Sequence, residues 1–444
     1  MVQSLDSGNQ AGEGFRRVLK NIGWLLGGKG FGAVCSLIYL AILSRSLGVK
    51  DFGHFSLIFG TAQALVALAG FQTWQTIVRF GAPDVLKGDW GRFGRLAVFG
   101  AVIDAVGALL GCALAAAIFY AFGAALELNP NYIDTAFAFI CVLVWARVSA
   151  PLGVLRVLDR YDLAVGAGAI TPAARLGAAV AIWLTGPTVE RFLIAWAAIE
   201  LIVAAIYWTI AWRLQPGALR LSYVRDWRQT LREHPGILGF LGLNYINSSV
   251  LSVLHQGPLL AVGYFLGTSA AGVYRIADQL ANGLSKLATL TAQALYPEVN
   301  RQRHGSPLDE FRKLVRRINL MVMGTGIIVV ALAAWLGEAL LVLIGGSDFA
   351  RGGVVLVPLA VGAAFELASV SYEPVLHATG HTAYPLLGRL LAVAALGVGI
   401  YLLVGGGAVG IGWAAALSFA VGYLAMSAMT WWALRQVARS DARA

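Results

Sequence analysis

Long apolar runs separated by short polar turns fill most of this sequence. A helix needs about 20 mostly apolar residues to cross the hydrocarbon of a bilayer. Dividing the chain at turn residues and charges predicts twelve such spans, so the pattern predicts an all-α integral membrane protein. The spans are expected near residues 20–46, 52–79, 95–122, 132–156, 163–185, 190–212, 237–264, 271–297, 315–344, 353–378, 385–404 and 408–433.

The composition agrees with lipid as the main solvent of the chain. Hydrophobic residues make up 58% of the sequence and charged residues 13%, and the mean hydropathy is +0.73. Soluble domains carry about 25% charged residues, so this chain has too little charge to cover a water-facing surface of normal size. Its 53 glycines suit helices that approach each other closely in a membrane.

Basic residues are distributed very unevenly between the two predicted sides of the membrane. Of 33 Lys and Arg residues, five lie within spans, and only Arg45, Lys50, Arg191 and Arg351 lie on one side, which leaves 24 on the other. Cytoplasmic loops carry such an excess, so we expect a multi-pass protein of a bacterial cytoplasmic (inner) membrane with both termini in the cytoplasm. The net charge of +10 then reflects topology, and we expect no nucleic-acid partner. The polar start of the chain is expected to be an uncleaved cytoplasmic segment.

A short motif occurs twice, each time between the first and second spans of a half. Leu47-Gly48 followed by Gly53-His54-Phe55 returns 219 residues later as Leu266-Gly267 followed by Gly272-Val273-Tyr274. Because each half has six spans, the halves insert with the same orientation, an arrangement found in transporters with the transport site between the repeats. We therefore expect two parallel six-helix lobes around a central cavity. The expected divisions are a cytoplasmic N-terminal segment (1–19), an N-lobe (20–212), a cytoplasmic linker (213–236), a C-lobe (237–433) and a cytoplasmic tail (434–444).

Polar residues form a stripe along one face of the eighth span. At 100° per residue, one side of this helix carries Arg275, Asp278, Gln279, Asn282, Lys286 and Gln293. The seventh span carries Asn244, Ser248 and His255 close together on one face and is expected to line the same cavity. Ionisable groups in a membrane normally face a cavity or one another, and an Arg275–Asp278 pair within the helix is the structural alternative.

Other charged residues occur singly within spans. Lys29, Arg147 and Arg175 join Arg275 and Lys286 as candidate ligands of an anionic substrate, because arginine binds phosphate in a bidentate manner; for each alone, reaching to the interface is the alternative. Glu366, Glu373 and His377 in the tenth span and Asp104 in the third are candidates for coupling to protons or other cations. For Asp104 and for Glu200 in the sixth span, pairing with an arginine is the structural alternative.

Several other chemistries are not indicated. The Gly23–Gly30 stretch resembles a phosphate-binding loop in spacing, but it lacks the final Ser or Thr and follows no strand. His377 and His381 have metal-like spacing without a third ligand nearby, and Cys35, Cys112 and Cys141 all lie in apolar runs. We expect no cofactor, no metal and no disulfide.

The first predicted hairpin resembles a known family. Asn21-Ile22-Gly23-Trp24, Leu43-Ser44-Arg45-Ser46-Leu47-Gly48 and Asp51-Phe52-Gly53-His54-Phe55 are similar to the opening of polysaccharide transporters. That family includes the O-antigen and exopolysaccharide repeat-unit flippases of the multidrug/oligosaccharidyl-lipid/polysaccharide exporter superfamily. The resemblance implies two lobes in a V around a cationic cavity and turnover of a polyprenyl-pyrophosphate-linked glycan between leaflets, driven by a cation gradient. Membrane lipids and other polysaccharide assembly proteins are the further partners expected.

Two alternatives to a flippase remain at this stage. One is a cation-coupled multidrug or metabolite antiporter of the same superfamily, which would rely on carboxylates and an apolar pocket. The other is a membrane glycosyltransferase or glycan polymerase. The short outer loops argue against such an enzyme, so we expect a protein that is not an enzyme.

Overall fold

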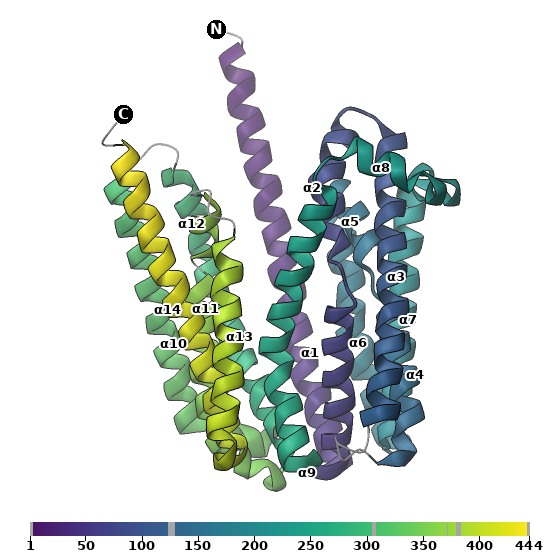
Figure 1. Cartoon of the computed structure of the whole chain (residues 1–444), viewed down its shortest axis with the longest axis vertical. Helices are drawn as coiled ribbons and strands as arrows, with labels where there is room; N and C mark the ends of the chain where they lie inside the picture. The colour runs from purple at the N-terminus through teal and green to yellow at the C-terminus, as the bar shows by residue number, and fades with distance from the viewer. Residues whose placement is uncertain (1–2, 123–128, 304–307, 371, 379–382, 442–444) are drawn as a thin grey trace. The chain divides into compact units, whose positions relative to one another are not determined.

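The computed structural model describes the backbone of residues 3–122, 129–303, 308–370, 372–378 and 383–441 (Figure 1). Side chains are described for 30–121, 129–283, 316, 319–369, 372–373, 375–376 and 383–436. Within these ranges every regular element is helical, which confirms the predicted all-α class. The α-helices are α1 (Gln3–Leu68), α2 (Thr73–Leu86), α3 (Trp90–Phe122), α4 (Ile133–Trp145), α5 (Ser149–Val157), α6 (Tyr161–Thr185), α7 (Val189–Leu214), α8 (Trp227–Glu233), α9 (Ile237–Arg303), α10 (Leu308–Gly345), α11 (Gly353–Val370), α12 (Glu373–Ala378), α13 (Tyr384–Leu403) and α14 (Gly407–Asp441). Short 3-10 helices are η2 (Pro130–Tyr132), η3 (Pro216–Leu219), η4 (Leu221–Asp226), η5 (Ser347–Gly352) and η6 (Val404–Gly406).

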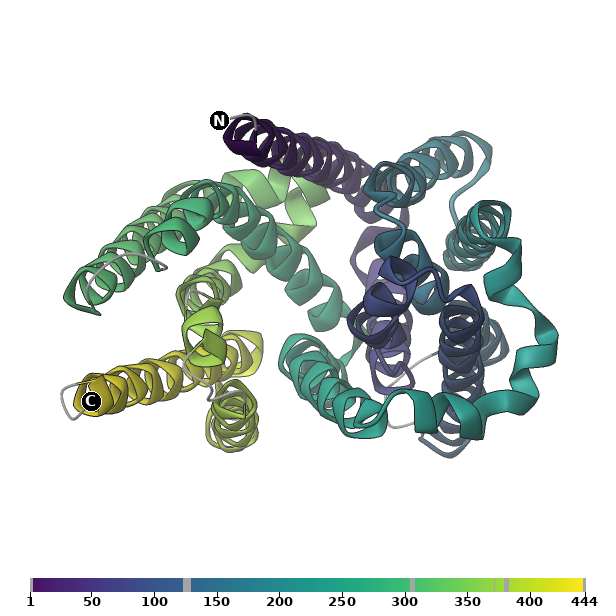
Figure 2. The same cartoon turned by 90° about the horizontal axis from the view of Figure 1, so that it is seen from above.

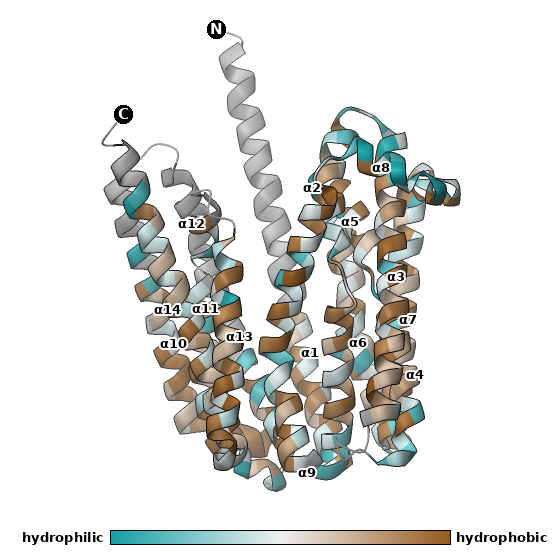
Figure 3. Cartoon of the chain, in the orientation of Figure 1, coloured by the Kyte–Doolittle hydropathy of each residue, from teal (hydrophilic) through white to brown (hydrophobic). Residues whose placement is uncertain are grey.

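Nine helical stretches of the described chain are long and apolar enough to cross a membrane. Three of them, Gly30–Leu86, Ile237–Gly283 and Tyr384–Gln436, have 57, 47 and 53 residues. Each of these three exceeds the roughly 20 residues that one crossing requires by enough for two crossings. The described helices therefore have room for the twelve predicted spans. Figure 3 shows apolar residues along most of their length and polar residues around α8.

The repeated motif marks an interruption in each of the two longest helices. Gly48 in α1 has φ 71° and ψ 175°, and Gly267 in α9 has φ 83° and ψ 178°. This backbone region is open essentially only to glycine. The two glycines therefore end one predicted span and begin the next with the same local geometry in both copies.

Two predicted spans are broken within the membrane region. The second span stops at Leu68 and restarts with α2 at Thr73, and the fourth stops at Trp145 and restarts with α5 at Ser149. In the first break Gln72 has a left-handed φ of 50°, which is uncommon for a residue with a side chain. Both spans were predicted to be continuous from the sequence, so these breaks are a correction.

The described chain divides into two compact units, each of which is discontinuous in sequence. Unit 1 contains residues 1–42, 65–119 and 134–246, and unit 2 contains residues 43–64, 120–133 and 247–444. The lobe boundaries expected from the sequence stay a prediction.

Unit 1 has an apolar core between α2, α3, α5, α6 and α7. Ile77, Phe93, Val154 and Ala211 are fully buried there, and the Tyr207 hydroxyl donates a 2.6 Å hydrogen bond to the Ala164 carbonyl. Paired polar groups are the usual requirement for burial away from water, so α6 and α7 are joined by both packing and a hydrogen bond.

Unit 2 is built around α14, which packs along α11 and α13, while α10 packs along α11 (Figure 2). The carbonyls at the end of α10 are capped by Arg45, whose Nη2 donates to Leu343 O at 2.7 Å. Such capping satisfies carbonyls that have no partner within the helix. Residues 43–64 of α1 are thus held in unit 2 by polar contacts as well as by apolar packing.

Candidate functional site

A small cavity lies inside unit 2, between α9, α11 and α14. Its volume is about 20 Å³, enough for roughly one water molecule. Most of its wall is apolar, and His255, Tyr274, Asp278, Asn282 and Glu366 supply the polar side chains. The cavity has room for one water molecule or a small cation, and it is too small for a glycan.

The polar residues of this cavity contact one another. His255 Nε2 lies 2.8 Å from Glu366 Oε1, and the Asn282 amide donates a 3.0 Å hydrogen bond to Asp278 Oδ1. Arg275 Nη1 lies 3.7 Å from Asp278 Oδ2, and its Cζ lies 5.8 Å from the centre of the Phe59 ring. With neutral histidine, two carboxylates face one arginine, so the group has a formal excess of one negative charge. The His255 and Glu366 side chains are 35% and 30% exposed, so this charge is only partly removed from water.

The cavity depends on helix spacing as well as on polar residues. Asp278 and Asn282 are one turn apart on α9, so their side chains share a face. His255 lies on the same helix before the Gly267 interruption, and Glu366 comes from α11. Residues separated by 111 positions therefore meet only because α9 and α11 pack in unit 2.

Glu373, another coupling candidate, is engaged elsewhere in unit 2. Arg389 Nη2 lies 2.8 Å from Glu373 Oε2, and Arg389 Nη1 also donates to Asn247 Oδ1. Arg389 was not among the residues singled out from the sequence, so its pairing with Glu373 was not predicted.

In unit 1, Asp104 on α3 lies at the point where both broken helices restart. Its Oδ2 accepts hydrogen bonds from Thr73 Oγ1 at 2.7 Å and from Ala150 N at 3.0 Å. Thr73 Oγ1 also lies 2.8 Å from Ser149 Oγ, which accepts from Trp74 N at 3.1 Å. The first amides of α2 and α5 are thereby satisfied by side chains, as helix starts require, and the carboxylate lies where helix dipoles favour negative charge.

A positive charge, that of Arg147, lies beside the end of α1, the helix that precedes the first break. Arg147 Nη1 donates a 2.6 Å hydrogen bond to Val66 O and occupies the space of a side chain at Gly70, whose Cβ would lie 0.8 Å from it. Arg147 also interacts electrostatically with Asp104. Asp104 Oδ1 is buried and has no hydrogen-bond partner among the residues that the structure describes. At the breaks, the Asp104 carboxylate therefore lies at the starts of α2 and α5, and the Arg147 guanidinium lies at the end of α1.

The sequence analysis identified Asp104 and Arg147 but missed Thr73 and Ser149. A signal was present for the second break, because Ser149 is followed two residues later by Pro151. A helix-capping residue just ahead of a proline in the first turn is typical of a helix start. For the first break the signal in the sequence is Gly70, which lies between Leu68 and Thr73.

Arg175 is paired within unit 1. Its Nη2 lies 2.8 Å from Glu200 Oε1, and its Cζ lies 5.5 Å from the centre of the Trp196 ring. This geometry matches the structural alternative that the sequence left open for Glu200.

The remaining candidates are less informative. Gln279 and Ser248 are half-buried on α9, and the amide nitrogen of Asn244 is buried with no hydrogen-bond partner in the described part of the chain. Lys29, Lys286, Gln293 and His377 lie outside the residues whose side chains are described. No group of three or more metal-binding side chains occurs among the described residues.

Solved structures with a similar fold are membrane transporters. The lipid II flippase MurJ in an inward closed conformation aligns with a TM-score of 0.71 at 11% identity, over 91% of this chain and 86% of that chain. An inward-facing multidrug resistance MATE family transporter of the MOP superfamily aligns with a TM-score of 0.67 at 14% identity, over 92% of this chain and 96% of that chain. The chain therefore has a multi-helix membrane fold like that of the MATE and MurJ transporters.

The family of this chain follows from comparing its sequence with those of known proteins. The model of the polysaccharide biosynthesis protein family matches residues 18–301, and this chain belongs to that family, which confirms the resemblance seen in the first hairpin. Inner membrane protein YghQ of Escherichia coli (strain K12) is 26% identical over 339 residues, 76% of this chain and 94% of that protein. Capsular polysaccharide biosynthesis protein CapF of Staphylococcus aureus is 29% identical over 135 residues, 30% of this chain and 34% of that protein.

Proposed function

We propose that this protein is a flippase that moves a polyprenyl-pyrophosphate-linked oligosaccharide or polysaccharide repeat unit across the cytoplasmic membrane by alternating access. The match to the polysaccharide biosynthesis family over residues 18–301 carries the proposal. The fold shared with a lipid II flippase supports a lipid-linked glycan as the cargo. Both chain ends are proposed to lie in the cytoplasm, as the arginine distribution predicts.

The intramembrane cations are the proposed ligands of the pyrophosphate. Arg275, Arg147 and Arg175 each have a carboxylate close by, so a substrate phosphate would compete with Asp278, Asp104 and Glu200 for them. Such competition suits a transporter, because a ligand that displaces an internal partner changes the balance between two conformations. Lys29 and Lys286 complete the proposed cationic set.

We further propose that a cation gradient drives transport through the unit 2 cavity. Its carboxylates, Asp278 and Glu366, lie beside a histidine, and intramembrane groups of this kind form proton and cation relays. Glu373, His377 and Asp104 are the other proposed coupling groups. Protonation of Glu366 or His255 would alter the 2.8 Å contact between them and so the link between α9 and α11.

The test is flipping in proteoliposomes. Purified protein is reconstituted with a fluorescent polyprenyl-pyrophosphate-linked sugar, and the fraction reached by a membrane-impermeant quencher is followed with and without a pH or sodium gradient. Parent protein should equilibrate the lipid between leaflets, and the Arg275→Ala/Lys286→Ala variant should not, although it remains folded. Arg191→Ala, which removes an exposed charge at the start of α7, is the control.

Coupling is tested in the same assay with Glu366→Gln and Asp278→Asn. These variants should keep passive flipping and lose its stimulation by a gradient, whereas Glu190→Gln at the start of α7 should keep both. Flipping by the double Arg275/Lys286 variant at the parent rate would refute the proposed substrate site. Gradient-driven efflux of a cationic dye without flipping would favour the antiporter, and sugar transfer by the purified protein would favour the enzyme.

A further inference from the structure

The segment that joins α7 to α9 has two different faces. This linker segment, residues 213–236, contains the end of α7, the 3-10 helices η3 and η4, and α8. Both α7 and α9 belong to candidate membrane spans. The segment between them carries five arginines and is divided into short helices, so it does not form the long apolar helix that a crossing requires and lies at one membrane surface.

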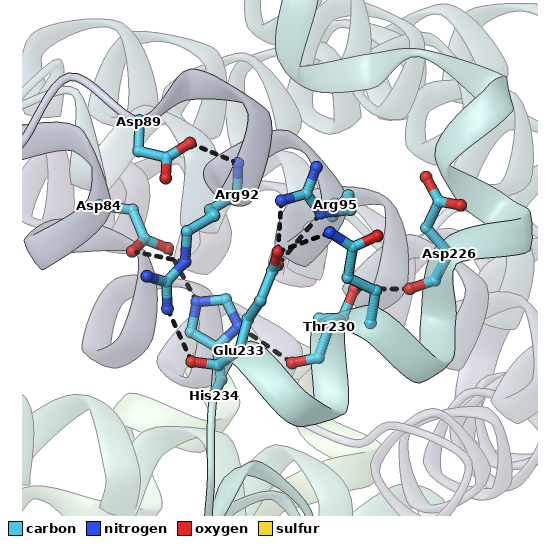
Figure 4. Close-up of polar contacts among 9 residues, drawn as sticks. Asp84, Asp89, Arg92, Arg95, Asp226, Thr230, Glu233 and His234 are labelled. Carbon is cyan, nitrogen blue, oxygen red and sulfur yellow. Dashed lines mark hydrogen bonds and ion pairs between the residues drawn. The ribbon is translucent and has the colours of Figure 1, made fainter.

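One face of the linker segment is fixed to α2 and α3 by charged contacts (Figure 4). Arg95 on α3 forms a two-pronged ion pair with Glu233, with Nε 3.0 Å from Oε2. Arg92 Nη2 donates to the Glu233 carbonyl at 2.7 Å. His234 Nε2 lies 2.8 Å from Asp84 Oδ2, and Arg92 Nε lies 3.6 Å from Asp84 Oδ1.

Close packing fixes the same face further along the segment. A Cβ on Gly94 of α3 would lie 2.7 Å from the Tyr223 ring and 3.1 Å from Gly217 O. Ala218 is completely buried. The linker segment thus has a defined orientation on unit 1, and the direction of its outer side chains follows from it.

The outer face combines exposed apolar and basic side chains. Leu221 is 86% exposed, Trp227 46% and Val224 41%. Five arginines, Arg213, Arg220, Arg225, Arg228 and Arg232, are exposed on the same segment. None of them forms an ion pair with a residue that the structure describes, and the Arg228 Cζ lies 5.2 Å from the centre of the Trp227 ring.

This combination matches the chemistry of a charged lipid surface. Amphipathic segments that combine exposed Trp and Leu with many arginines bind at the boundary between headgroups and acyl chains. Arginine binds phosphate through paired N–H donors, and its apolar stem can rest on the same boundary. The segment has two acidic residues, of which Glu233 is already held by Arg95, and Asp226 alone cannot balance the five exposed arginines.

We propose that the outer face of the linker segment is a binding surface for anionic phospholipid headgroups. Leu221, Val224 and Trp227 enter the boundary of the bilayer, and Arg220, Arg225 and Arg228 bind the phosphates of the surrounding lipids. The surface belongs to unit 1, whereas the cavity between α9, α11 and α14 belongs to unit 2, and the surface requires neither the proposed substrate nor a gradient.

The experiment places an environment-sensitive probe on the segment. Ser222 is exposed next to Leu221, and replacing Cys35, Cys112 and Cys141 with alanine leaves Ser222→Cys as the single thiol for an NBD label. The labelled protein in phosphatidylcholine mixed micelles is titrated with phosphatidylglycerol. The parent should show a blue shift, protection from acrylamide quenching and saturable, salt-sensitive binding.

Arginine variants then measure what the charges contribute. Basic residues near an anionic surface each add roughly fivefold to binding, so Arg220→Gln/Arg225→Gln/Arg228→Gln should weaken the phosphatidylglycerol affinity roughly a hundredfold. The matched lysine variant should keep most of the attraction. Arg191→Gln, at the opposite end of α7, should leave it unchanged. Equal gel-filtration profiles and melting temperatures establish that each variant is folded.

Three outcomes would overturn the proposal. A probe that stays quenchable in both lipids would mean that the segment does not touch the bilayer. If the triple glutamine variant kept the parent's affinity for phosphatidylglycerol, the arginines would not be part of the binding surface. Equal displacement by soluble glycerol phosphate would indicate a site for free phosphate instead of a lipid surface.

Discussion

Gly53 and Gly272 lie at equivalent positions of the repeated motif and pack against each other inside unit 2. A Cβ on Gly272 would lie 3.1 Å from Gly53 N and 3.2 Å from Gly53 Cα, and 2.7 Å from Val49 O. A Cβ on Gly53 would lie 1.9 Å from Thr268 O. Residues 49 and 268 are themselves separated by the repeat offset of 219, so each copy of the motif contacts the other in the same way.

This reciprocity is the pattern expected when two like-oriented copies pack around a local two-fold axis. The close approach of two backbones also explains why both positions are glycine, since small residues allow membrane helices to touch. The repeat that the sequence indicated is therefore also a structural contact.

Gly53→Ala and Gly272→Ala should each destabilise the protein. An added methyl group meets backbone atoms that cannot rotate away, and overpacking of this type costs about 1–3 kcal/mol. Thermal unfolding in detergent measures the effect. Gly166→Ala in α6, where nothing lies within 4 Å of the new Cβ, is the control, and melting temperatures equal to that control would contradict the predicted contact.

Asp104→Ala should loosen the starts of α2 and α5 together. The variant removes the acceptor shared by Thr73 Oγ1 and Ala150 N, and losing a helix cap costs about 1 kcal/mol. Hydrogen exchange should quicken at the Ala150 amide. Thr73→Val should affect the start of α2 while Ala150 stays protected, and Asp162→Asn at the start of α6 should affect neither. Unchanged protection in Asp104→Ala would mean that the half-helices are held by packing alone.

Removing one partner of the Arg175–Glu200 pair should destabilise unit 1 more than removing both. The side chains are 10% and 26% exposed, and an unpaired charge at a buried site costs about 3 kcal/mol. Arg175→Met and Glu200→Leu should each lower the melting temperature, and the double variant should recover much of the loss. Additive losses in this cycle would show that the pair is not coupled.

The linker segment should stay attached to α3 at neutral pH and detach only in acid. Burial alone would raise the pKa of the Glu233 carboxyl, but the hydrogen bonds from Arg95 and Gln229 outweigh it and lower the pKa below its usual value. A lowered carboxyl pKa adds stability above the unfolded value of roughly 4.3, and this stability is lost as the pH falls through the folded value. Probe mobility at Ser222→Cys should therefore rise below about pH 4.

Glu233→Gln provides the comparison for this pH effect. The variant lacks the ionisable carboxyl, so its linker segment should be more mobile at neutral pH and should lose most of the acid transition. Arg160 and Asp162 form a separate exposed pair, and Asp162→Asn should leave the transition in place. A parent-like acid transition in Glu233→Gln would assign it to another group.

The apolar pattern alone predicted the long helices of this chain, but without the breaks before Thr73 and Ser149. In lipid a backbone must satisfy its own hydrogen bonds, so a long apolar run has to be helical. The same pattern located the glycine interruptions at Gly48 and Gly267, because the motif repeats at a constant offset. It also placed Asp278 and Asn282 on one face of α9, since side chains four residues apart on a helix point the same way.

Only the tertiary structure decided which charges meet. The contacts of His255 with Glu366, Arg175 with Glu200 and Arg389 with Glu373 depend on which helices are neighbours and how each is rotated. The breaks before Thr73 and Ser149 were not predicted because each lies inside a run of mostly apolar residues long enough for one continuous span. Their stability comes from Asp104 on a third helix, and a one-dimensional pattern does not record contacts between helices.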